Sequence, residues 1–62
     1  MCESTVYLKT DQGEEMLMEE VARLVVTDSG ILMSNLLGEE REFPARISSI
    51  DFLDHRVTVV RD

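Results

Sequence analysis

The chain has 62 residues, enough for one domain with a thin core, so residues 1–62 are expected to form a single domain. Thirteen acidic residues against six basic ones give a formal net charge of −7, which repels the phosphate backbone of nucleic acids. One cysteine excludes an intramolecular disulfide and favours a reducing compartment. No signal peptide and no apolar run of membrane-spanning length are visible, so a cytoplasmic protein without membrane contact is expected.

The N-terminal half of the chain follows the two-residue period of β-strands. Apolar or small residues alternate with polar ones over residues 2–9, which predicts a strand with one face turned inward. A turn is predicted at residues 11–13. Residues 14–20 include good helix formers but no N-cap followed by an apolar stripe, so a short strand or irregular segment is predicted there. Residues 21–27 are rich enough in β-branched side chains to form a strand.

The C-terminal half continues the strand pattern. Asp28-Ser29-Gly30 is the clearest hairpin turn in the sequence. A later strand should end at Phe43, because the residue before a proline favours extended geometry. Further strands are predicted over residues 31–36, 47–52 and 57–60, with a polar turn over residues 53–56.

This pattern predicts an all-β fold, with about six short strands and no βαβ alternation that would favour a parallel sheet. A sheet this small must close on itself or leave open edges. A small SH3-like antiparallel β-barrel, or an OB-like one, satisfies this requirement. Any edge left uncovered favours a homodimer, which would also enlarge the core.

The residues needed for catalysis are mostly missing, so no enzymatic activity is expected. A nucleophile pair of Cys2 and His55 is conceivable, but a terminal cysteine is poorly held for positioned chemistry. Neighbouring glutamates on a strand point to opposite faces and form no carboxylate dyad. His55 lies in a charged turn and is expected to be exposed, while Met16, Met18 and Met33 are expected to fill gaps in the core or an interface.

Cys2 is the strongest candidate for a functional residue. Removal of Met1 is expected before a small second residue, and it would leave Cys2 with both a thiol and a free α-amine. In model compounds these groups have pKa values of about 8.5 and about 8, so a metal can displace both protons at neutral pH. Two such residues on a twofold axis offer two sulfurs and two nitrogens, which suit square-planar Ni(II) or Cu(II). The alternative is that Cys2 is a small, half-buried apolar residue at the start of a strand.

Three parts of the sequence together resemble the CooT-type proteins. These are the opening Met1-Cys2 before an alternating strand, the middle segment 31–40 with its Leu-Gly-Glu turn, and the closing segment 47–59 that runs through His55. No single motif is highly specific, but the order, the spacing and the total length match over nearly the whole chain. The resemblance implies an SH3-like barrel and a homodimer with one nickel ion shared between the two Cys2 residues.

The resemblance also implies a function in nickel supply. Such proteins are accessory proteins, in some members for carbon monoxide dehydrogenase maturation, so a nickel-enzyme maturation protein is an expected partner. Similar sequences have also been labelled RNA-binding proteins, and the net charge of −7 speaks against that label here. The competing hypothesis is a metal-free β-barrel interaction module that binds a protein partner or RNA along its open edge.

Assembly follows from the ligand count. One Cys2 supplies at most two donors, whereas a transition-metal site usually needs four, so a homodimer with its axis close to the first strand is expected. The apolar residues available for its interface include Met16, Leu17, Met18, Leu36 and Leu37. RNA binding would instead require the basic residues to cluster on one face; these are Lys9, Arg23, Arg41, Arg46, Arg56 and Arg61.

Overall fold

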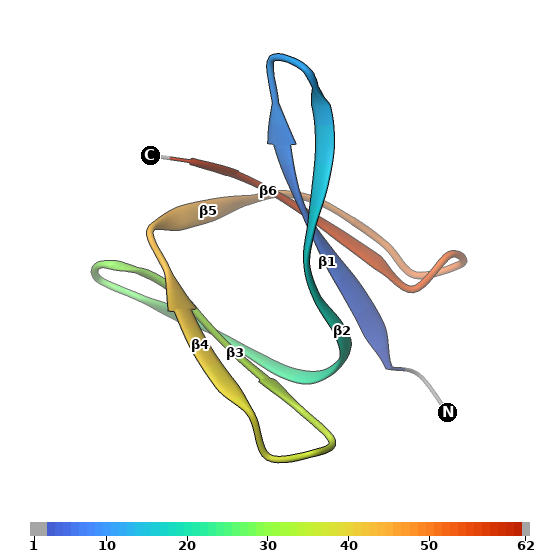
Figure 1. Cartoon of the computed structure of the whole chain (residues 1–62), viewed down its shortest axis with the longest axis vertical. Coiled ribbons are helices and arrows are strands. Elements are labelled where there is room, and N and C mark those ends of the chain that lie inside the picture. Colours follow the sequence, from blue (N-terminus) through green and yellow to red (C-terminus); the bar gives the residue numbers. More distant parts are fainter. Residues whose placement is uncertain (1–2, 62) are drawn as a thin grey trace.

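The computed structural model describes residues 3–61, which form one six-stranded β-sheet (Figure 1). Its spatial order is β4-β3-β2-β1-β6-β5. Residues 3–61 contain no helix with the length and hydropathy of a membrane span. The six strands of this one sheet confirm the predicted all-β fold class. The strands are β1 (Ser4–Thr10), β2 (Gly13–Thr27), β3 (Gly30–Asn35), β4 (Glu40–Phe43), β5 (Ala45–Asp51) and β6 (Arg56–Arg61).

The sheet is curled into a half-barrel, and the cause lies at one corner. Strands β4 and β5 stand at opposite ends of the sheet order, yet only Pro44 separates them in the chain. The two edges must therefore approach each other there. Gly30 lies against this corner, and a Cβ atom on it would stand 2.1 Å from the carbonyl oxygen of Phe43. Its φ of +147° is also one that side-chain-bearing residues rarely adopt, so the close approach requires glycine.

One strand pair differs from the antiparallel arrangement expected from the sequence. Strands β1 and β6 pair in parallel, from Thr5 opposite Arg56 to Lys9 opposite Val60, while the other four pairs are antiparallel. The absence of βαβ alternation excludes a helical crossover but not this pair. Here the connection between the two parallel strands is the whole curled sheet, which brings the first and last strands of the chain side by side (Figure 1).

Strand β2 is long and sharply bent. The segment that was ambiguous in the sequence, residues 14–20, is part of it. Its register with β1 shifts twice, between the pairs Ser4–Val21 and Val6–Met18 and again between Val6–Met18 and Tyr7–Met16, and each shift indicates an extra residue in β2. Glu20 has a left-handed φ of 55° at this point. The bend lets the first half of β2 pair with β1 and the second half with β3, so residues 13–20 have no strand partner on their outer edge within residues 3–61.

The core contains side chains from all six strands. The predicted inward face of the first strand is confirmed, because Val6 and Leu8 are almost completely buried. No polar or charged side chain within residues 3–61 is classed as buried, so the interior is purely apolar. The buried residues are Val6, Leu8, Val21, Ile31, Met33, Phe43, Ala45, Val57 and Val59.

Candidate functional site

The predicted metal ligand, Cys2, lies outside the described residues. The residue after it, Glu3, leads directly into β1. Residues 3–61 hold no group of three or more His, Cys, Asp or Glu side chains that could bind a metal ion. The part of the chain that the structure describes therefore offers no such cluster by itself, and the role of Cys2 as a metal ligand stays a prediction.

Two turns flank the end of the sheet where the chain enters β1. On one side, the amide of Thr5 donates to the carbonyl oxygen of His55 at 2.9 Å, which places the turn at residues 52–55 beside the start of β1. On the other side, Val21 of β2 pairs with both Ser4 and Asn35, which places the turn at residues 36–39 one strand further away. We refer to them as the 52–55 turn and the 36–39 turn.

The 52–55 turn is held by the side chain of Asp51. Its carboxylate oxygen Oδ1 accepts hydrogen bonds from the amides of Leu53 (3.0 Å) and Asp54 (3.1 Å), the geometry of an Asx turn. Phe52 and Leu53 lie almost fully in solvent, 82% and 92% exposed. His55 is exposed, as predicted, and takes a left-handed φ of 53°. The suggested pairing of His55 with Cys2 stays a prediction, because Cys2 is outside the described range.

The 36–39 turn is held more extensively, by Asn35. Its Oδ1 accepts from the amides of Leu37 and Glu39, both at 3.0 Å, and its Nδ2 donates to the carboxylate of Glu39 at 2.7 Å. Backbone bonds between Asn35 and Glu39 (3.1 Å) and between Gly38 and Asn35 (3.2 Å) close the loop. The turn presents Leu36 and Leu37 to solvent, 57% and 81% exposed.

A pocket of about 330 Å³ lies between the 36–39 turn and the bent part of β2. Its lining has four apolar residues, three acidic ones and one basic residue, Arg41, whose Nη1 donates to the carbonyl oxygen of Leu17 at 3.2 Å. Four of the five apolar residues suggested above for a dimer interface contribute to it. We call it the Leu37 pocket; its lining is Met16, Leu17, Met18, Glu19, Glu20, Asn35, Leu37, Glu39 and Arg41.

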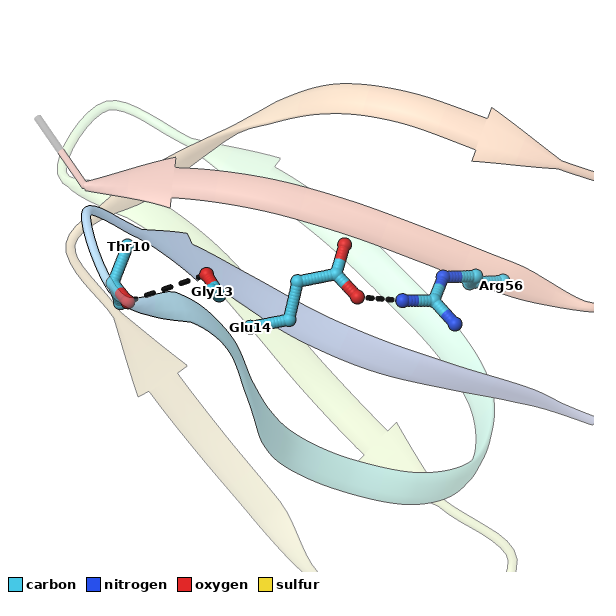
Figure 2. A network of polar contacts seen from close by, with 4 residues as sticks. All are labelled: Thr10, Gly13, Glu14 and Arg56. Atoms are coloured by element: carbon cyan, nitrogen blue, oxygen red, sulfur yellow. Dashed lines mark hydrogen bonds and ion pairs between the residues drawn. The ribbon is translucent and has the colours of Figure 1, made fainter.

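Several basic side chains are engaged within the chain. Arg56 forms an ion pair with Glu14 and stacks over the ring of Tyr7, with its Cζ 4.0 Å from the ring centroid (Figure 2). Figure 2 also shows the Thr10 hydroxyl donating to the carbonyl oxygen of Gly13, at the turn between β1 and β2. These contacts connect β1, β2 and β6.

Two further arginines stack on one aromatic ring. The Cζ atoms of Arg41 and Arg61 lie 5.4 and 4.9 Å from the ring centroid of Phe43. Together with Arg56, three of the six basic residues thus contact aromatic rings of their own chain. These contacts give no support to an RNA-binding surface, which needs basic groups free to reach phosphates.

The comparisons with known proteins agree with this geometry. The family model described as CO dehydrogenase accessory protein CooT matches residues 1–60. The chain belongs to the CooT family. An uncharacterized protein from Methanothermobacter thermautotrophicus is 36% identical over 59 residues, which cover 95% of this chain and 88% of the relative. A crystal structure of a protein assigned to CooT from Carboxydothermus hydrogenoformans superposes with a TM-score of 0.92 at 30% identity and covers 98% of both chains.

These findings confirm the family resemblance and the half-barrel fold. CooT is a family of CO dehydrogenase accessory proteins. That role is consistent with the expectation that the chain has no enzymatic activity. Neither the Leu37 pocket nor the exposure of Phe52 and Leu53 was predicted from the sequence. One local signal could have revealed the exposed apolar residues of both turns. In each, an Asx residue, Asn35 or Asp51, is followed by two large apolar residues, and an Asx turn directs such residues away from a strand.

Proposed function

We propose that this CooT-family chain is a nickel-binding accessory protein that carries metal and catalyses no reaction. Cys2 would bind Ni(II) at a homodimer interface, and the metal would be passed on during CO dehydrogenase maturation. The observation that carries the proposal is the family match over residues 1–60 in a chain whose only cysteine is its second residue. A nickel-enzyme maturation protein is then the expected partner.

The donor chemistry supports nickel. After removal of Met1, the thiolate and the α-amine of Cys2 would form a five-membered chelate ring with the metal. Two copies would supply two sulfur and two nitrogen donors, a set that suits square-planar Ni(II). Since residues 3–61 contain no cluster of three ligating side chains, a second copy is the simplest source of the remaining donors.

The 52–55 turn supports a contact between two copies near the start of β1. Its Phe52 and Leu53 are the most exposed large apolar residues of the described chain, and the turn lies against Thr5. Burying two such side chains in a symmetric contact would stabilise a dimer and bring the two N-termini toward one axis. The Leu37 pocket suits this contact less, because a twofold contact there would bring the acidic lining residues of the two copies close together.

Nickel titration of the mature protein tests the proposal. Intact mass first establishes that Met1 has been removed. Addition of Ni(II) should then produce thiolate-to-nickel charge-transfer absorbance that saturates at about 0.5 nickel per chain, as a shared twofold site requires. The Cys2→Ala variant should lose this absorbance. An unchanged signal in Cys2→Ala, or saturation at one nickel per monomer, would falsify the shared site.

The alternative is a metal-free interaction module for a protein partner or RNA. The Leu37 pocket favours the protein version over the RNA version, because three acidic residues in its lining would repel phosphate groups. Binding to a generic single-stranded RNA that weakens steeply with salt would support the RNA version instead.

A further inference from the structure

The Leu37 pocket has features that neither the core nor the proposed nickel site requires. Its lining includes Met16, Leu17 and Met18, from the part of β2 whose outer edge has no strand partner within residues 3–61. Met16 is 51% exposed and Leu37 is 81% exposed, so neither contributes much to the interior. Methionine side chains adapt their shape to different apolar surfaces. An exposed apolar site of this kind is typical of a surface that binds another molecule.

The turn beside the pocket is ordered before any partner binds. Three side-chain hydrogen bonds of Asn35 and two backbone bonds hold residues 35–39, although nothing packs over Leu37. A partner that contacts Leu37 would therefore not have to order the turn, which lowers the entropic cost of binding.

Charge decides what kind of partner fits. Glu19, Glu20 and Glu39 belong to the lining, and the one basic lining residue, Arg41, already donates to the carbonyl oxygen of Leu17. A second copy would have the same acidic lining residues and a net charge of −7, so the two copies would repel each other at this surface. A basic partner would meet opposite charges instead.

We propose that the Leu37 pocket docks a partner protein through an aliphatic side chain flanked by lysine or arginine residues. The aliphatic side chain enters the pocket between Met16 and Leu37, and the flanking cations pair with Glu19 and Glu20. A volume of about 330 Å³ accommodates a short segment of chain rather than a folded domain. The pocket lining includes no residue of the 52–55 turn, so a partner in the pocket and a contact at that turn do not compete for the same side chains.

The test uses the intact protein labelled with nitrogen-15 and a defined probe, the acetylated and amidated peptide Lys-Leu-Lys-Leu-Lys. Amide shifts should change in a cluster over residues 16–20 and 35–41. A Glu-Leu-Glu-Leu-Glu peptide should bind at least about tenfold more weakly, since reversing two exposed ion pairs has about that effect. A Lys-Ser-Lys-Ser-Lys peptide should also lose binding, because it lacks the aliphatic side chain.

Matched variants make the test specific to the pocket. Leu37→Ser should weaken peptide binding at least about tenfold, whereas Leu53→Ser, an equally exposed leucine on the other turn, should leave it unchanged. Thermal melts of both variants verify that the fold persists. Cys2→Ala should bind the peptide normally, so failure of the nickel proposal would not be mistaken for failure of this one.

Three results would overturn the proposal. The first is shift changes spread evenly over the acidic surface, which would mean non-specific attraction. The second is an equal loss of affinity in Leu37→Ser and Leu53→Ser. The third is a dimer that Leu37→Ser alone converts to monomer, which would assign the pocket to a second copy of this chain.

Discussion

The two turns beside the start of β1 have the same local design but different surroundings. In each, an Asx side chain accepts the amide two residues further on at 3.0 Å, and two large apolar residues are left in solvent. The 36–39 turn faces the bent β2 and borders an acidic pocket. The 52–55 turn lies against Thr5 and has a single acidic residue, Asp54. The local motif exposes apolar side chains, and the neighbouring strands decide what those side chains can bind.

This difference allows two separate contacts at one end of a very small sheet. Strands β1 and β2 stand between the turns, so a partner on one does not cover the other. A turn with one acidic residue brings less like charge into a contact with its own copy than the acidic pocket would. An acidic pocket suits a basic partner. The variants below separate these roles, beginning with the change that should remove both.

Gly30→Ala should have the largest effect and disrupt both turns together. The new Cβ would collide with the carbonyl oxygen of Phe43 at 2.1 Å and take a φ that alanine rarely adopts. We expect a loss of about 3 kcal/mol or more in the free energy of unfolding, which is most of the stability of a domain this size. Urea unfolding followed by circular dichroism measures it.

Gly13→Ala is the matched control for this change. Gly13 also has a positive φ, +124°, but nothing lies within 4 Å of its added Cβ. It should lose only about 1–2 kcal/mol, from backbone strain alone. Equal losses in the two variants would show that the contact at the β4–β5 corner is not what requires glycine at position 30.

The double variant Phe52→Ser and Leu53→Ser should break the proposed dimer without unfolding the chain. Both side chains are more than 80% exposed, so the monomer fold does not depend on them. We expect the dimer dissociation constant to rise about 100-fold, from the loss of two buried apolar groups. Sedimentation velocity at micromolar concentration measures it, with nickel binding followed in parallel.

The matching double variant Leu36→Ser and Leu37→Ser should leave the dimer and its nickel stoichiometry intact. If this pair dissociates the dimer instead, the assignment of the two turns is reversed. If neither pair has any effect on a stable dimer, the interface lies elsewhere on the sheet.

Removal of the Asx side chain should destabilise the protein more at the turn where that side chain makes more hydrogen bonds. Asn35→Ala loses three side-chain bonds, while Asp51→Ala loses two. We expect losses of about 2 and about 1 kcal/mol in the free energy of unfolding, because each bond contributes about 0.5–1.5 kcal/mol. Amide hydrogen exchange at residues 37 and 53 should rise in the respective variant only. The ranking is wrong if Asp51→Ala proves the more costly change.

Arg56→Ala should have the smallest effect. The ion pair with Glu14 is more than one-third exposed, so water screens it, and the stacking on Tyr7 adds a little more. We expect a loss of about 0.5–1 kcal/mol at low salt that shrinks in 1 M NaCl. A Glu14→Gln variant should show the same salt dependence, while a loss that salt does not alter would assign the effect to the stacking alone.

Much of the local structure could be read from the residues. The alternation in β1 correctly placed Val6 and Leu8 inside, because a strand sends successive side chains to opposite faces. The hairpin turn at Asp28 and Ser29 and the end of β4 at Phe43 followed from turn chemistry and from proline. The family also was recognisable from the order and spacing of its segments, and the comparisons confirmed it.

Closure of the sheet decided the rest. The bend at Glu20, the parallel pairing of β1 with β6 and the unpaired edge above the Leu37 pocket all depend on which distant strands meet. The alternation of apolar and polar residues predicts which face of a strand is buried, but it does not predict which other strand will pair with it. Residues 14–20 are ambiguous as a segment and become a bulged strand only because they pair with β1, while β3 pairs with the residues that follow them in β2. The chain therefore encodes its strands and turns locally, while their surroundings, and with them the candidate binding surfaces, arise when the two sheet edges are drawn together at Pro44.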